Sequence, residues 1–97
     1  MTPQEYIERL IEYHKQEEQV AKERNGDYSA SVDCFSNFRR YNEIQFLSRM
    51  YEKFCRIENI IQTGKTNSVG DRFEDAIYDL CNYAHLLLAF TEEKSRK

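Results

Sequence analysis

This sequence has few of the residues that break helices or build tight turns. Its 97 residues include 1 Pro, 3 Gly and no Trp. Tight turns between β-strands depend on Gly and Pro, so this small supply argues against an all-β fold. With 32% charged and 40% hydrophobic residues, the composition favours an all-α protein of one domain spanning residues 1–97.

Long apolar segments and strong charge of either sign are also lacking. The longest apolar run, Leu86–Phe90, is far too short to span a bilayer, and no apolar segment follows Met1. The net charge of -3 provides no broad attraction to a DNA or RNA polymer or to an anionic membrane. We therefore expect a cytoplasmic protein with no membrane partner.

Cysteine is scarce and irregularly placed. Cys34, Cys55 and Cys81 are odd in number and far apart. This spacing matches neither a disulfide framework nor a zinc site. Buried, reduced thiols are the expectation, as in other cytoplasmic proteins.

Hydrophobic periodicity predicts three helices, over about residues 3–23, 43–63 and 69–93. Thr2-Pro3-Gln4-Glu5 is a strong start, with Thr as N-cap, Pro at the first helical position and Glu at the third. Asn25-Gly26 predicts a break, because both residues accept a positive φ. Residues 24–40 are expected to form a functional loop.

Each predicted helix has apolar residues at helical spacing. On the first they include Tyr6, Ile7, Leu10, Ile11, His14 and Val20. On the second, the predicted buried side consists of Ile44, Leu47, Met50, Tyr51, Phe54, Ile57 and Ile61. A chain this short often completes its core against another copy, so we expect a small helical bundle completed by oligomerisation.

The most unusual feature is an acidic stripe on the third predicted helix. Asp71, Asp75 and Asp79 are four residues apart and Asn82 extends the row, so their side chains lie over one another. Stacked carboxylates repel one another unless a metal ion or a basic side chain lies among them. The stripe therefore predicts either a cation site or ion pairs.

A short connection between the second and third helices makes them antiparallel neighbours, which brings Asp71 and Asp75 towards Glu52, Arg56 and Asn59. Oxygen ligands without His or Cys favour Mg²⁺ or Mn²⁺. Lys53 and Arg56 could then neutralise a polyphosphate, and a metal-activated water could attack a phosphoryl group. The simpler alternative is that Asp75 and Asp79 are partly buried and pair with nearby arginines: Arg49, Arg56 or Arg72.

The loop over 24–40 also has two interpretations. Aromatic side chains beside an amide and two arginines could stack on a base and bind its edge; the group comprises Tyr28, Phe35, Asn37, Phe38, Arg39 and Arg40. Alternatively, Phe35 and Phe38 pin the loop to the core. The second interpretation is the simpler one.

The order of several short motifs resembles a known family. The motifs are Arg24-Asn25-Gly26-Asp27-Tyr28, Phe35-Ser36-Asn37-Phe38, Glu52-Lys53-Phe54-Cys55-Arg56-Ile57 and the segment Asp71 to Tyr83. In this order they are similar to a small, often phage-encoded group of MazG-like all-α nucleotide pyrophosphohydrolases. The resemblance spans roughly residues 24–88.

The resemblance implies a role for each matching residue. The metal-binding acids would be Glu52, Asp71 and Asp75, with Asp79 and Asn82 supporting them or touching substrate. The phosphates would be held by Lys53 and Arg56, and the base or sugar by Tyr28, Asn37 and Phe38. Such enzymes are dimers or tetramers that use Mg²⁺ to cleave a nucleoside triphosphate to its monophosphate and pyrophosphate.

This chain also departs from the family pattern. The superfamily has Glu-Glu-x-x-Glu on the second helix of its site, this chain has no such motif there, and Asp71 stands where the group has Glu. Three hypotheses follow. The first is metal-dependent hydrolysis of a (deoxy)nucleoside triphosphate. The second is a nucleotide-sequestering protein of the same fold that does not cleave, as a phage could use against host signalling. The third is a helical protein-interaction module.

Overall fold

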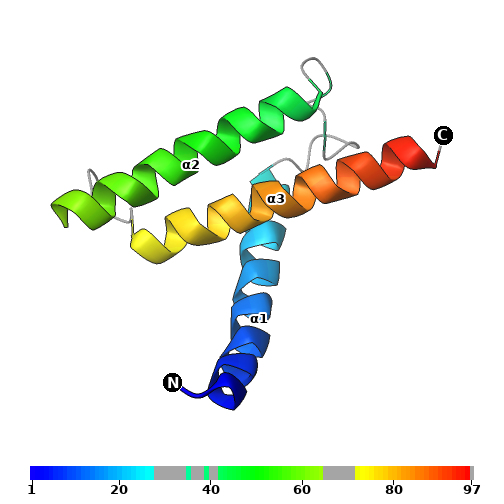
Figure 1. The fold of residues 1–97 in the computed structure, drawn as a ribbon. Helices are drawn as coiled ribbons and strands as arrows, with labels where there is room; N and C mark the ends of the chain where they lie inside the picture. Colours follow the sequence, from blue (N-terminus) through cyan, green and yellow to red (C-terminus); the bar gives the residue numbers. More distant parts are fainter. Residues whose placement is uncertain (28–34, 36–38, 40–41, 65–71, 97) are drawn as a thin grey trace.

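The structure is a computed structural model that describes residues 1–27, 35, 39, 42–64 and 72–96. These residues contain three helices and no strand: α1 (Pro3–Asp27), α2 (Glu43–Thr63) and α3 (Phe73–Ser95). The all-α class predicted from composition is thereby confirmed. As Figure 1 shows, α2 and α3 lie side by side, while α1 extends away from α3 at a steep angle.

The N-terminal signal of α1 operates as predicted. The Glu5 backbone N–H donates to Thr2 Oγ1 at 3.1 Å, and the Thr2 N–H lies 3.5 Å from Glu5 Oε1. This reciprocal capping satisfies N–H groups that have no partner within the helix.

The expected end of α1 at about residue 23 is not what the structure shows, because the helix continues to Asp27. Asn25-Gly26 lies inside its last turn. A glycine costs only about 1 kcal/mol in a helix, so it weakens the last turn without forcing an end.

Three contacts set the antiparallel register of α2 and α3. The aromatic rings of Phe46 and Phe90 are 5.2 Å apart. Lys94 Nζ donates to Glu43 Oε1 at 2.8 Å where α2 begins and α3 ends, and this hydrogen bond is the main cause of the lowered pKa of Glu43. Lys53 meets Asp79 farther along the pair.

The boundaries of α2 agree with the predicted 43–63. Gly64 follows in the left-handed conformation, with φ of 68°, and its N–H donates to the Ile60 carbonyl at 2.7 Å. Glycine accepts this conformation without a steric penalty, which is why the helix ends there.

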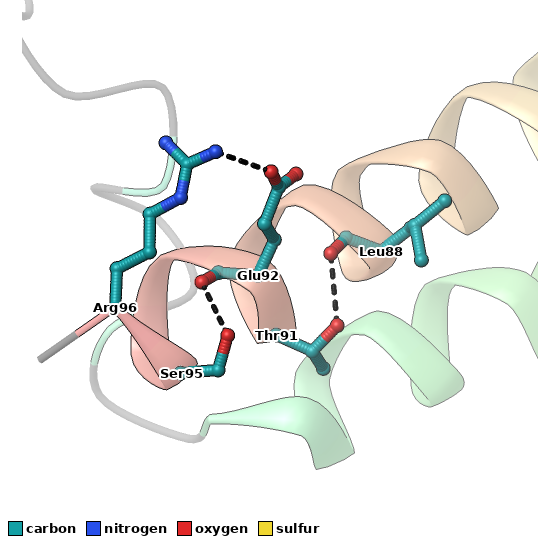
Figure 2. A network of polar contacts seen from close by, with 5 residues as sticks. All are labelled: Leu88, Thr91, Glu92, Ser95 and Arg96. Carbon is teal, nitrogen blue, oxygen red and sulfur yellow. Dashed lines mark hydrogen bonds and ion pairs between the residues drawn. The ribbon is translucent and has the colours of Figure 1, made fainter.

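The helix α3 starts later than the predicted residue 69, since Arg72 is extended, with ψ of 156°. Its end is held by short-range contacts, shown in Figure 2. Thr91 and Ser95 donate to the carbonyls of Leu88 and Glu92 at 2.8 and 2.9 Å. Arg96 also pairs with the Glu92 carboxylate at 2.7 Å. These bonds satisfy polar groups of the last turns.

Three phenylalanines form the core of the described residues. Phe35, Phe46 and Phe90 are at most 4% exposed, and their ring centroids lie 5.2–6.4 Å apart. The guanidinium of Arg39 lies 5.2 Å from the Phe35 ring centroid and pairs with Glu93 at 2.9 Å. Within the segment 24–40, Phe35 therefore pins the chain to the core, as the simpler interpretation predicted.

The predicted buried side of α2 is wrong for most of its members. Five of the seven predicted residues are more than half exposed: Ile44, Leu47, Tyr51, Phe54 and Ile61. The side that faces α3 lies one position round the helix and comprises Glu43, Phe46, Met50, Lys53, Ile57 and Ile60, all buried or half-buried. Both rows have helical spacing, so periodicity alone could not choose between them.

Among the described helices, α1 packs against α3 and does not contact α2. Tyr6, Ile7 and Ile11 remain about half exposed on it. None of the three described helices is both long and apolar enough to cross a membrane.

Replacing Phe46 by Ala should lower the free energy of unfolding by about 3–5 kcal/mol, because it leaves a cavity beside the Phe35 and Phe90 rings. Chemical denaturation followed by circular dichroism measures this loss. Ile7→Ala, at a half-exposed position on α1, is the control and should cost less than about 1 kcal/mol. Equal losses in the two variants would contradict the assigned core.

Candidate functional site

The candidate site lies where α2 and α3 face each other with polar side chains. We call Lys53 and Arg56 of α2, with Asp75 and Asp79 of α3, the α2–α3 polar face. All four residues are buried or half-buried. As Figure 1 shows, α2 and α3, the two helices that carry these residues, lie side by side and antiparallel.

The centre of this face is an ion pair between the helices. Lys53 Nζ lies 3.3 Å from Asp79 Oδ2, and the two side chains are 24% and 11% exposed. Asp79 is the one charged residue in the described ranges that counts as buried. A buried carboxylate needs a partner that compensates for lost hydration, and Lys53 is that partner.

The family resemblance implied that Asp71 and Asp75 matter more than Asp79, whereas in the described structure Asp79 is the carboxylate inside the helix pair. The Asp75 side chain is 42% exposed, and its Oδ2 lies 3.6 Å from Nε of Arg72, the residue just before α3. Arg72 is one of the arginines named in the simpler alternative to a metal site. The acidic stripe thus avoids repulsion by pairing with basic residues at two of its positions.

Glu52, the predicted acid of α2, lies on the outer surface. Its side chain is 62% exposed, and its Oε2 is 3.4 Å from Arg49 NH1 on the same helix. The Lys94–Glu43 and Lys53–Asp79 contacts set the register of the two helices. In this register, Glu52 and Asp75 are separated by roughly 10 Å along the helix axes. The structure does not bring these two acids together.

A shared Mg²⁺ ion requires its oxygen ligands within about 2.1 Å of the metal. Glu52 and Asp75 do not meet this condition in one chain. Across the described ranges, no three His, Cys, Asp or Glu side chains lie close enough to hold a metal ion. The third predicted ligand, Asp71, is outside the described residues. The acids that the structure describes therefore do not fit a joint magnesium site within one chain.

The predicted substrate-binding residues divide into two groups. Lys53 and Asp79 meet between α2 and α3, whereas Asn82 lines a cavity with residues of α1. Arg56 is half-buried on α2. Tyr28, Asn37 and Phe38, predicted to face the base or sugar, lie outside the described residues. Of this set, the structure therefore brings Lys53 and Asp79 into contact.

A second polar cluster lies between α1 and α3, and sequence reasoning missed it. A cavity of about 600 Å³ opens there, with walls that include Tyr13, Phe73 and Ile77. At its polar edge His85 Nδ1 contacts the Glu17 carboxylate. These partners are 68 positions apart and belong to no motif, so only the crossing of the two helices reveals them.

Cys81 lines the same cavity. Burial raises the pKa of the Cys81 thiol, and the negative charge of Glu17 raises it further. Both causes favour the neutral thiol over the thiolate. Of the cysteines expected to be buried, Cys81 is half-buried, Cys55 is exposed, and Cys34 lies outside the described residues.

Comparisons with protein-family models, with curated proteins and with solved structures found no match for this chain.

Breaking the inter-helix ion pair should destabilise the fold. Asp79→Asn should lower the free energy of unfolding by about 2–3 kcal/mol, below the usual cost for fully buried pairs because Lys53 keeps some contact with water. Urea denaturation measures the loss, and a double-mutant cycle with Lys53→Met isolates the coupling between the two side chains.

Glu52→Gln is the control for this experiment, because it removes a carboxylate from an exposed pair with Arg49. Its effect should stay within about 0.5 kcal/mol. A loss as large as that of Asp79→Asn, or no coupling in the cycle, would show that Lys53 and Asp79 do not hold the helices together.

The two described cysteines should differ in reactivity. At pH 8, alkylation of Cys81 should be slower than that of exposed Cys55, because the Cys81 thiol is half-buried and its pKa is raised. Glu17→Gln should speed the reaction at Cys81 and leave Cys55 unchanged. Peptide mass spectrometry over time measures both rates, and equal rates in the unsubstituted protein would contradict the environment described.

Proposed function

We propose that this chain binds a nucleotide through its phosphates at the α2–α3 polar face. The observation that carries the proposal is the Lys53–Asp79 pair, which holds a cation of α2 against α3. Arg56 lies one turn beyond Lys53 on α2 and is also half-buried. Two partly desolvated cations at this spacing suit a polyphosphate, since phosphate oxygens accept strong hydrogen bonds from both side chains.

The neighbouring residues support the same proposal. Asp79 keeps Lys53 extended towards α3, so the ammonium group is positioned before a ligand arrives. Asn82 is half-buried one turn after Asp79 on the same helix, and its amide supplies donors for a phosphate or sugar oxygen. The proposed ligand is a (deoxy)nucleoside triphosphate or a signal nucleotide derived from one.

Sequestration without cleavage is the form of this function that the geometry favours. Glu52 pairs with Arg49 on its own helix and Asp75 with Arg72 just before α3, and the two acids lie apart along the α2–α3 pair. A binder needs only the cations of the face and the neighbouring Asn82 amide. In a phage-encoded protein of the host cytoplasm, such binding would withdraw a nucleotide signal from its receptor.

Hydrolysis is the second candidate, and the order of the motifs supports it. The resemblance to MazG-like pyrophosphohydrolases implies an all-α NTP pyrophosphatase-like bundle, a dimer or tetramer, and Mg²⁺ or Mn²⁺ held by Glu52, Asp71 and Asp75. The metal would supply charge neutralisation and an activated water. Lys53 and Arg56 would have the same phosphate-binding role in either candidate.

The test is a panel of ribo- and deoxyribonucleoside triphosphates with Mg²⁺, assayed for thermal shift and for pyrophosphate release. A nucleotide at 100 times its Kd should stabilise the fold by about 2.7 kcal/mol, which raises the melting temperature by several degrees. Under the favoured form, the nucleotide is recovered intact. Release of pyrophosphate that stops in Asp75→Ala, with helicity retained, would instead establish hydrolysis.

Matched arginine variants locate the binding site. Arg56→Gln should abolish most of the thermal shift, because it removes a cation from the α2–α3 polar face. Arg49→Gln removes the same charge from the exposed surface of the same helix and should leave the shift in place. No shift with any nucleotide, or equal losses in both variants, would overturn the proposal.

A further inference from the structure

The second helix carries an apolar row that nothing in the described chain covers. Five of its side chains are 51–69% exposed, and we call them the α2 outer stripe: Ile44, Leu47, Tyr51, Phe54 and Ile61. They follow one another at intervals of three and four residues, with Glu58 at the one remaining position. That spacing places all six on one side of the helix, as in the seam of a coiled coil.

The size of the molecule indicates how much covering is missing. The chain exposes 7532 Å², whereas a compact protein of 11.7 kDa exposes about 5,900 Å². Its radius of gyration is 15.2 Å, compared with about 12.5 Å for a compact chain of this length. The excess is about 1,600 Å², to which the α2 outer stripe and the half-exposed apolar residues of α1 both contribute. Each partner in a stable interface buries about 800 Å².

The flank of the stripe away from α3 is free of charge. Its positions are Ser48, Cys55 and Gln62, spaced seven residues apart. Small or uncharged side chains let another helix approach without burying an unpaired charge. In coiled coils these flanking positions usually carry charges that select a particular partner, and here they do not.

We propose that the α2 outer stripe packs against the same stripe of a second copy of this chain, with the two α2 helices antiparallel. The intervals along the row read three, four, three, four, three, the same in both directions. A two-fold axis midway between Tyr51 and Phe54 then places Tyr51 against Phe54 of the other copy. Ile44 comes to lie against Ile61 in the same way. Such self-complementarity is what a two-fold interface requires.

A second copy explains the observations better than a foreign partner. The uncovered area is large for a transient contact, and a chain that leaves this much apolar surface needs a partner present whenever it is made. Another copy is always present at the same concentration. The interface is independent of the nucleotide proposal, because Lys53 and Arg56 are not members of the stripe.

Glu58 provides a test that strengthens the interface. In the antiparallel arrangement it faces Leu47 of the other copy, where a charge opposes burial. Glu58→Leu should therefore lower the dimer Kd by about 10-fold or more. If the stripe instead bound a different protein, Glu58→Leu would not be expected to strengthen self-association.

Sedimentation velocity over a range of concentrations tests the proposal. The unsubstituted chain should be a dimer, and Leu47→Glu should raise the Kd at least about 100-fold. Asn59→Glu is the control, because it adds the same charge at an exposed position of α2 outside the stripe. This variant should leave the dimer intact. A monomer at all concentrations, or a dimer insensitive to Leu47→Glu, would overturn the proposal.

Disulfide trapping tests the orientation and remains informative if Leu47→Glu unfolds. In chains whose native cysteines are serine, Ile44→Cys mixed with Ile61→Cys should form a covalent heterodimer on mild oxidation. Each variant alone should not, because an antiparallel pair separates identical positions. Crosslinking of each variant with itself would show a parallel pair and contradict the arrangement. Absence of crosslinking in every mixture would also contradict it.

Discussion

The antiparallel register of α2 and α3 is the constraint on which the other features depend. The Phe46–Phe90 contact fixes it in the apolar core, and the Lys94–Glu43 and Lys53–Asp79 contacts fix it at charged positions. Aromatic packing supplies most of the favourable free energy, while the ion pairs penalise a shifted alignment that would leave a buried charge without a partner. A shift by one turn would separate Lys53 from Asp79.

The same register underlies our proposal of binding without cleavage. It brings Lys53 of α2, a proposed phosphate ligand, to Asp79, the inner acid of α3. It also separates Glu52 from Asp75, so these two described acids do not lie close enough to share a metal ion. The α2–α3 polar face and the α2 outer stripe occupy different sides of one helix. The proposed nucleotide site and the proposed interface with a second copy therefore do not compete for the same surface.

The sequence predicted the helices well because helix signals are local. The capping residues Thr2 and Glu5 and the glycine at position 64 act through neighbours a few positions away. The pairing of α2 with α3 followed from the short connection between them. Which apolar row of α2 is buried could not be predicted, because that choice depends on how α3 is rotated against α2. Lys53 was predicted as a phosphate ligand, but its pairing with Asp79 required the register.

Nucleotide binding at the α2–α3 polar face is the central claim, and backbone amide chemical shifts test it most directly. Titrating the isotope-labelled protein with a nucleoside triphosphate and Mg²⁺ reports which residues sense the ligand. The account predicts that the largest changes fall at Lys53 and Arg56 on α2 and at residues 79–82 on α3. Largest changes along α1, or none with any nucleotide, would contradict it.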